Sequence, residues 1–415
     1  MNLKKKLLGG LKFTFENAGS LLIVKAAGIA VNYLALMLIL HFFGVYGNGE
    51  VANFIAQSKG LMIFFVFGLD IILVKKLNAL DKDLQSLVNI GKTLLLNFII
   101  GLLLFVLVNQ FIAISYAFLA GGIFLALWRF TSHFYRGKNN MIAYGFFEFV
   151  LFQTTVLISI FISQYFQISL IESIVYINIA FVLIFFPYFF LKNRRIFKTN
   201  LFLNLKSLKK IYLESYHFLL SNSIIIISTS VLYYLIKTNY STETLGFYDG
   251  ILKFSLVISL PLIATNGRVM FKTSNFFNNN KLDDLKKYIN NITKMLVVMS
   301  TAAALFVAIV FYVYSEFFNV EFQSYWLLFI LLVCAQLVNN WAGPVGILLQ
   351  LTNNEKIYNL LTFFTSVYLI LSTLIIVNTL SINYVALNYV VYMLLQNVTS
   401  LLIVKRKINI NPYKL

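Results

Sequence analysis

The chain has 415 residues, of which 60% are hydrophobic and only 12% are charged, and its mean hydropathy is +0.83. A soluble globular domain is about half apolar and about a quarter charged, so this composition excludes a water-soluble globule and predicts an all-α polytopic membrane protein. The net charge of +18 does not indicate a nucleic-acid partner, because the basic residues lie in short loops between apolar runs, where they set membrane topology.

Several kinds of chemistry find no support in the sequence. The single cysteine, Cys334, excludes an internal disulfide. His41, His133 and His217 are far apart and lack metal-ligand spacing, and neither a glycine-rich phosphate loop nor a paired-carboxylate motif occurs. We therefore expect no enzymatic activity, no metal and no cofactor.

Twelve apolar runs are long enough to cross a membrane, which takes about 20 residues in a helix. In chain order they cover 19–43, 51–74, 92–110, 112–134, 142–164, 169–191, 215–236, 246–270, 290–313, 325–350, 357–378 and 382–404. The sequence therefore predicts twelve transmembrane helices.

The connections between these runs alternate in charge. Those on one side are rich in lysine and arginine, as in Lys75-Lys76 and Lys405-Arg406-Lys407, whereas those on the other side are nearly bare, with Lys237 as the exception. Basic loops stay in the cytoplasm, so the alternation predicts that both termini are cytoplasmic.

The longest basic connection, 192–214, is the natural joint between two six-helix lobes, 1–191 and 215–415. Apolar residues recur at helical spacing among its lysines between Leu205 and Tyr212. This pattern fits a helix lying in the membrane interface. An ordinary basic loop fits it equally well, and both interpretations stay open.

Three lysines lie farther inside the apolar runs than any other lysine: Lys25, Lys59 and Lys253. A lysine in the middle of a spanning helix costs about 2.5–3.5 kcal/mol on insertion scales, so we expect its ammonium to face something wet or anionic, and for Lys59 and Lys253 we expect only a ligand or water to offset that cost. Lys59 lies ten residues after Gly49 and Lys253 seven after Gly246. The difference of three is close to one turn, which places both on nearly the same face of corresponding helices. This favours two parallel repeats with a cationic cleft between them. The alternative is that the lysine heads reach the membrane interface, most easily for Lys25.

Other charged residues lie near helix ends. Arg129 either lines the entrance of the cleft or extends the basic belt that meets lipid phosphates. Glu148 is a candidate for proton coupling, although an ion pair with a basic neighbour explains it equally well. Asp70 precedes two lysines and is better explained as an anchor of cytoplasmic structure. The scarcity of intramembrane carboxylates argues against a cation-coupled drug pump.

Short motifs along nearly the whole chain are similar to those of one transporter family. They are Gly44-Val45-Tyr46-Gly47, Gly68-Leu69-Asp70, Tyr135-Arg136-Gly137-Lys138-Asn139-Asn140 and Leu245-Gly246-Phe247-Tyr248-Asp249. In this order they resemble the polysaccharide-transporter branch of the multidrug/oligosaccharidyl-lipid/polysaccharide (MOP) exporters, in particular Wzx-type O-antigen flippases. One departure is Ser215-Tyr216-His217, which lacks the proline that usually opens the seventh helix of that family.

The resemblance implies a MATE/MOP-like fold of twelve helices in two six-helix lobes around a central cleft, in a bacterial inner membrane. It also implies translocation of an undecaprenyl-diphosphate-linked oligosaccharide, of O-antigen or capsule type, by alternating access, and a polysaccharide polymerase as a candidate partner. Lys25, Lys59 and Lys253 correspond to basic positions that the sibling lipid II flippases use. The expected substrate-binding residues are thus these three lysines and Arg129. The alternatives are a drug/cation antiporter of the same superfamily and a lipid II flippase.

Overall fold

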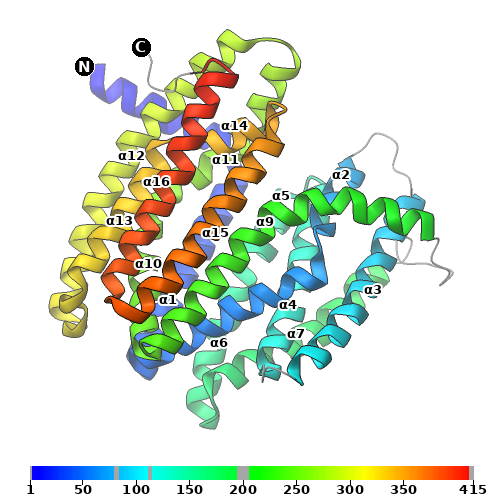
Figure 1. Ribbon diagram of the computed structural model, residues 1–415, viewed down its shortest axis with the longest axis vertical. Coiled ribbons are helices and arrows are strands. Elements are labelled where there is room, and N and C mark those ends of the chain that lie inside the picture. Colours follow the sequence, from blue (N-terminus) through cyan, green and yellow to red (C-terminus); the bar gives the residue numbers. More distant parts are fainter. Residues whose placement is uncertain (1, 79–83, 111–114, 194–204, 411–415) are drawn as a thin grey trace. The chain divides into compact units, whose positions relative to one another are not determined.

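The computed structural model describes residues 2–78, 84–110, 115–193 and 205–410, and within these ranges every regular element is a helix. The chain forms two compact units, which we call the N-terminal unit (Ile23–Tyr234) and the C-terminal unit (Leu235–Leu415 with Met1–Leu22). Each is described by itself. Figure 1 labels their helices.

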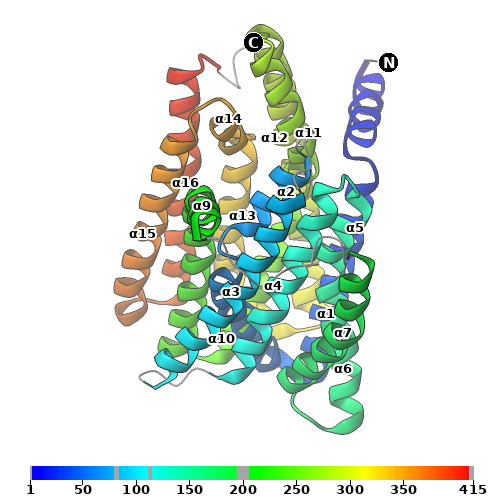
Figure 2. The ribbon, with the colours of Figure 1, turned by 90° about the vertical axis from the view of Figure 1, so that its right-hand side faces the viewer.

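The N-terminal unit is built from one very long helix and a series of shorter ones. They are α1 (Asn2–Val66) from Ile23 onward, α2 (Leu69–Asn78), α3 (Leu84–Asn109), α4 (Tyr116–Gly137), α5 (Met141–Gly145), the π-helical η1 (Phe146–Val150), α6 (Leu151–Phe166), α7 (Leu170–Lys192) and most of α9 (Leu205–Asn239). Helices α6 and α7 lie side by side (Figures 1 and 2).

The C-terminal unit contains three long helices, several shorter ones and two 3₁₀ turns. They are α10 (Thr242–Leu256), η2 (Val257–Ser259), α11 (Leu260–Asn278), α12 (Leu282–Phe317), η3 (Val320–Tyr325), α13 (Trp326–Trp341), α14 (Val345–Leu351), α15 (Glu355–Thr379) and α16 (Ile382–Lys407). Helix α16 packs along both α13 and α15 (Figure 1).

The apolar runs of the sequence coincide with these helices. Ten helical segments among the described residues are long and apolar enough to span a membrane, and the first, Ile23–Val66, covers two expected runs. A shorter apolar helix, Ser223–Asn239, covers the seventh run from residue 223 onward. The predicted class, an all-α polytopic membrane protein, is therefore confirmed. The division at 192–214 stays a prediction, and residues 194–204 of that connection lie outside the described ranges.

Helix α1 does not run straight through its two spans. Ala35 and Phe54 belong to one buried cluster, although 19 residues of straight helix would hold them about 28 Å apart. Gly44 breaks the regular path with a φ of 64°. At this positive φ glycine carries no steric penalty. The ribbon of α1 accordingly turns back near its lower end in Figure 1. The expected pair of spans is therefore a helical hairpin without an irregular loop.

The basic stretch before the seventh run is helical from Leu205 onward and continuous with α9. Ile211 is buried with residues of α2, α3, α4 and α7. The Tyr212 hydroxyl donates a hydrogen bond to Asn97 Oδ1 (2.5 Å), and Lys76 pairs with Glu214 (3.7 Å). Of the two open interpretations, the helical one holds from residue 205, and its apolar face packs on protein.

In each unit, one expected spanning helix is interrupted by residues with positive φ. Phe67 and Gly68, with φ of 47° and 73°, end α1 and start α2, so the second expected run is not one continuous helix. In the tenth run Gly343, with φ of 74°, separates α13 from α14. The break after α1 sets the position of Asp70, the first acidic residue of the site.

Candidate functional site

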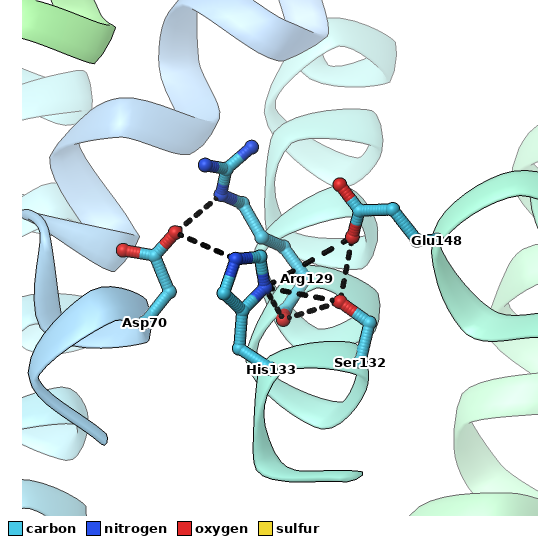
Figure 3. A network of polar contacts seen from close by, with 5 residues as sticks. All are labelled: Asp70, Arg129, Ser132, His133 and Glu148. Carbon is cyan, nitrogen blue, oxygen red and sulfur yellow. Dashed lines mark hydrogen bonds and ion pairs between the residues drawn. The ribbon is translucent and has the colours of Figure 1, made fainter. Parts of the chain in front are cut away.

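A buried ion pair joins α2 to α4. Arg129 Nε donates a hydrogen bond to Asp70 Oδ2 at 2.7 Å, and the Asp70 side chain is only 3% exposed. Asp70 occupies the second residue of α2, directly after the positive-φ break, so the break turns its carboxylate toward α4 (Figure 3). A charge-assisted bond in such a dry place holds the two helices together strongly once both partners are present.

The next turn of α4 adds two polar side chains to this pair. His133 Nε2 lies 3.7 Å from Asp70 Oδ2, and its Nδ1 lies 4.0 Å from Glu148 Oε2. Ser132 Oγ lies 2.6 Å from the same Glu148 oxygen. Figure 3 shows Asp70 on one side of α4 and Glu148 on the other, with Ser132 and His133 between them. We call Asp70, Arg129, Ser132, His133 and Glu148 the α4 network.

The π-helical segment η1 positions Glu148. A π-helical turn holds one more residue than an α-helical turn, and it redirects the side chains it contains. It also contacts α1 closely, because a Cβ atom built on Gly28 would meet the Phe149 carbonyl oxygen at 2.6 Å. Lys25, one turn earlier, places its ammonium 4.9 Å from the centre of the Phe149 ring and within electrostatic range of Glu148.

The charged residues of this site lie at similar depth. Arg129 is eight residues before the end of α4 and Asp70 eight before the end of α2, each about 12 Å along its helix. Glu148 is seven residues after Met141, where α5 begins, or about 10 Å. All three helix ends belong to connections that the sequence assigns to the cytoplasmic side. The network therefore forms one layer of the N-terminal unit.

Lys59 lies elsewhere in the N-terminal unit. Its side chain is exposed on α1, whereas Ser58 before it is fully buried. Two residues earlier, Gln57 Nε2 donates to the Ser230 carbonyl oxygen at 3.0 Å, which fixes this part of α1 against α9. The lysine thus extends from a rigidly packed helix.

Lys253 belongs to the C-terminal unit and has a carboxylate partner. Its ammonium lies 2.7 Å from Asp249 Oδ2, one helical turn earlier on α10. The expectation that only a ligand or water offsets the cost of this lysine is therefore wrong, because Asp249 does so within the same helix. The i, i+4 spacing of Asp249 and Lys253 in the sequence already predicts such an ion pair on a helix.

The structure thus brings together some of the expected site residues. Arg129, Glu148 and Lys25 meet around the α4 network, Lys59 lies apart from the network on α1, and Lys253 is in the other unit. Sequence analysis missed His133, whose spacing of four from Arg129 puts both on one face of α4 and was the available signal.

The network contains serine, histidine and carboxylates but does not have the arrangement of a nucleophilic site. Ser132 is fully buried, and its hydroxyl contacts Glu148 and the Arg129 carbonyl oxygen besides His133. Among the described residues, no group of three or more His, Cys, Asp or Glu side chains could hold a metal ion. The chemistry that this arrangement supports is charge pairing and proton exchange.

Comparison with known proteins gives the fold. No protein-family model and no curated protein sequence matches the chain. Among solved structures, the lipid II flippase MurJ in an inward closed conformation matches with a TM-score of 0.67 and 17% identity, over 92% of this chain and 87% of its own. The MATE multidrug transporter DinF-BH matches with a TM-score of 0.65 and 14% identity, over 97% of both chains.

A third match is a MOP superfamily transporter from Pyrococcus furiosus, whose description states that a reversed polarity of its binding pocket suggests a different function. It has a TM-score of 0.57 and 15% identity, over 97% of both chains. The chain therefore has the two-lobed, twelve-helix fold of the MATE/MOP transporters. At these identities the similarity concerns the fold alone, and proteins of this one fold differ in what they carry.

Proposed function

We propose that the protein is a flippase that moves an undecaprenyl-diphosphate-linked oligosaccharide of O-antigen or capsule type across the bacterial inner membrane by alternating access. One observation carries this proposal: Lys59 extends an exposed side chain from the second span of α1, at a place where Gln57 fixes that helix against α9. A diphosphate headgroup that meets this exposed ammonium would form charge-assisted hydrogen bonds with it. The fold, shared with a lipid II flippase, is compatible with such a cargo.

The other basic residues receive distinct roles in this proposal. Lys25 and Lys253 take part in diphosphate binding, and their contacts with Phe149 and Asp249 hold them in place between transport cycles. Arg129 is committed to Asp70, so its part is to position α2 and α4 at the cytoplasmic entrance. Glu148 serves in coupling. The lipid tail stays in the bilayer while the headgroup crosses.

The expected lobes, topology and partner are also part of this proposal. Lobes 1–191 and 215–415, joined by 192–214, enclose a central cleft, and both termini are cytoplasmic. A polysaccharide polymerase would receive the flipped unit on the outer side. In a Cys334→Ala background, cysteines introduced at 44–49, 163–169 or 378–383 would label from outside in intact cells, whereas one at Lys198 or Lys281 would not.

Two alternatives keep support. The fold is shared with a MATE multidrug transporter, and the carboxylates Asp70 and Glu148 lie close to one histidine, which favours an antiporter more than the sequence did. The fold is also shared with a lipid II flippase. An antiporter would confer dye efflux that Lys59→Ala leaves intact, and a lipid II flippase would support growth of cells depleted of their own.

The test is restoration of surface polysaccharide in a flippase-deficient host, with membrane protein level measured in parallel. Loss of one charge-assisted contact, about 1.5–3 kcal/mol, would weaken headgroup capture about ten- to hundredfold in Lys59→Ala. Lys59→Arg retains partial activity because the charge remains. Lys287→Ala, which removes an exposed lysine on α12, is the matched control. Full restoration by Lys59→Ala at normal protein level would contradict the proposal.

A further inference from the structure

The α4 network contains an unbroken series of groups that can exchange protons. Glu148 Oε2 and Ser132 Oγ are 2.6 Å apart, and Ser132 Oγ and His133 Nδ1 are 3.1 Å apart. On the far side of the imidazole ring, Nε2 lies 3.7 Å from Asp70 Oδ2. The series crosses α4 from η1 to α2, as Figure 3 shows.

The Ser132 hydroxyl has more acceptors than protons. Besides Glu148 Oε2 and His133 Nδ1, it lies 2.8 Å from the Arg129 carbonyl oxygen. A hydroxyl carries one proton and can rotate it to any of these partners while accepting from another. When Glu148 is ionised, the hydroxyl donates to its carboxylate. When Glu148 is protonated, the carboxyl donates to the hydroxyl, and the hydroxyl proton turns to His133 Nδ1 or the carbonyl.

His133 Nδ1 likewise has one partner for each of its protonation states. Without a proton it accepts from Ser132 Oγ at 3.1 Å. With a proton it donates to the Arg129 carbonyl oxygen at 3.0 Å. A buried polar atom without a partner costs about 1–3 kcal/mol, and Nδ1 has a partner both in the imidazolium and in the neutral ring beside a protonated Glu148. The surroundings therefore accommodate both the neutral ring and the imidazolium.

We propose that Glu148, Ser132 and His133 form a proton relay that ends beside Asp70. The Glu148 carboxyl gives its proton to Ser132 Oγ while the Ser132 hydroxyl gives its own proton to His133 Nδ1. Glu148 becomes a carboxylate, Ser132 is unchanged, and the neutral His133 with hydrogen on Nε2 becomes an imidazolium. The new positive charge lies between the carboxylates of Asp70 and Glu148, 3.7 and 4.0 Å away.

The other charged and titratable groups around the ring come from three more places. Arg129 and Arg136 on α4 act on His133 as positive charges, and the Tyr144 ring of α5 meets the imidazole edge-on, with ring centres 5.9 Å apart. Lys25 on α1 is within electrostatic range of Glu148. Because Arg129 stays bonded to Asp70, about one negative charge, that of Glu148, remains to balance the proton that the relay carries.

The relay depends on the extra residue of η1, which turns Glu148 toward α4. A proton held on His133 strengthens the attraction of α4 for both α2 and η1, whereas its release weakens both contacts at once. The relay is thus a device by which proton occupancy changes the packing of the N-terminal unit. Its use as the coupling step of transport rests on the proposed function, but its existence does not.

The test uses full-length protein in lipid vesicles with ¹⁵N-labelled histidine and the substitutions His41→Gln and His217→Gln, which leave His133 as the only histidine. Nitrogen NMR then reports the protonation of Nδ1 and Nε2 as the pH is varied. We expect a neutral ring with hydrogen on Nε2 in base and an imidazolium in acid. Glu148→Gln, which removes a negative charge 4.0 Å away, should weaken proton binding at least about tenfold.

Two further variants separate a relay from mere proximity. Ser132→Ala should slow exchange of the Nδ1 proton with water, because the intervening hydroxyl is gone. Glu172→Gln, an exposed acid in the first turn of α7, should change nothing. A ring that stays in one neutral tautomer throughout, or that titrates identically in Glu148→Gln, overturns the relay.

A transport measurement then tests the coupling role independently. If the NMR result holds and Glu148→Gln or His133→Gln still restores surface polysaccharide fully, the coupling role is overturned while the relay stands. If the unaltered protein fails to restore polysaccharide, the proposed function fails and the NMR result is unaffected.

Discussion

Each unit buries a network of polar side chains between its helices, and the two networks differ in chemistry. In the N-terminal unit, α4 carries Arg129 and His133 against two carboxylates from α2 and η1. In the C-terminal unit, α13 carries Gln336 and Asn340, which bond the Ser259 hydroxyl of η2 at 2.7 and 3.0 Å. Amides and hydroxyls keep their protons at any physiological pH, whereas the α4 network can change its charge. The α4 network can therefore respond to protons, whereas the network of Ser259, Gln336 and Asn340 cannot.

The largest effect is expected from breaking the α4 ion pair. Arg129→Met leaves Asp70 buried without its guanidinium, which should cost about 3–5 kcal/mol of stability. The double variant Asp70→Asn/Arg129→Met should recover most of that loss, because no charge is left uncompensated. Thermal unfolding of purified protein measures both. A double variant as unstable as the single one would mean that the ion pair contributes to stability beyond compensating its own two charges.

The next largest effect concerns the charged pair of the C-terminal unit. Lys253→Met leaves Asp249 without its lysine, and we expect a loss of stability somewhat below that of Arg129→Met, because the Asp249 side chain left without its partner is 8% exposed and that of Asp70 only 3%. Asp249→Asn/Lys253→Met should be close to the unaltered protein in unfolding temperature. If Lys253→Met instead stabilises the protein, the ammonium is not held by Asp249 in the membrane.

A smaller effect is expected from disrupting the uncharged network of Ser259, Gln336 and Asn340. Ser259→Ala removes the hydroxyl that donates to Gln336 and accepts from Asn340, and buried polar contacts between membrane helices are worth about 1–2 kcal/mol. The loss should be the same at low and high pH, since nothing in this network titrates. A pH-dependent loss would remove the contrast between the two units.

These predictions rest on contacts that the sequence discloses to different degrees. The apolar runs predicted the helices because lipid exposure demands about 20 apolar residues wherever a helix spans. The Asp249–Lys253 pair was also accessible, since it is local. The Asp70–Arg129 pair joins residues 59 apart in the chain, and no periodicity in one sequence reveals which helices become neighbours.

Two backbone features could not be predicted for a different reason. The π-helical turn around Glu148 adds one residue to a predominantly apolar helix, and the hydrophobic pattern does not record it. The break at Phe67-Gly68 falls inside the second apolar run, with apolar residues on both sides, and it places Asp70 opposite Arg129. The site therefore depends on irregularities that a pattern of apolar residues conceals.

The smallest effect is expected from removing two helix N-caps, one in each unit, which should cost the same stability. Ser169 caps α7 in the N-terminal unit by accepting from the Glu172 amide at 3.2 Å, and Ser241 caps α10 in the C-terminal unit by accepting from the Thr244 amide at 3.0 Å. Replacing either with alanine should cost about 1 kcal/mol. Unfolding measurements at two pH values should give equal losses, and unequal ones would show that the units differ in overall rigidity as well as in charge.

The central claim is that Lys59 helps to carry a diphosphate headgroup across the membrane. The most direct measurement is flipping of a fluorescent undecaprenyl-diphosphate oligosaccharide by purified protein in vesicles, read by quenching from outside. The account predicts flipping by the unaltered protein and by Lys287→Ala, partial flipping by Lys59→Arg, and a rate about ten- to hundredfold lower for Lys59→Ala at subsaturating lipid. Equal rates for Lys59→Ala and the unaltered protein would contradict it.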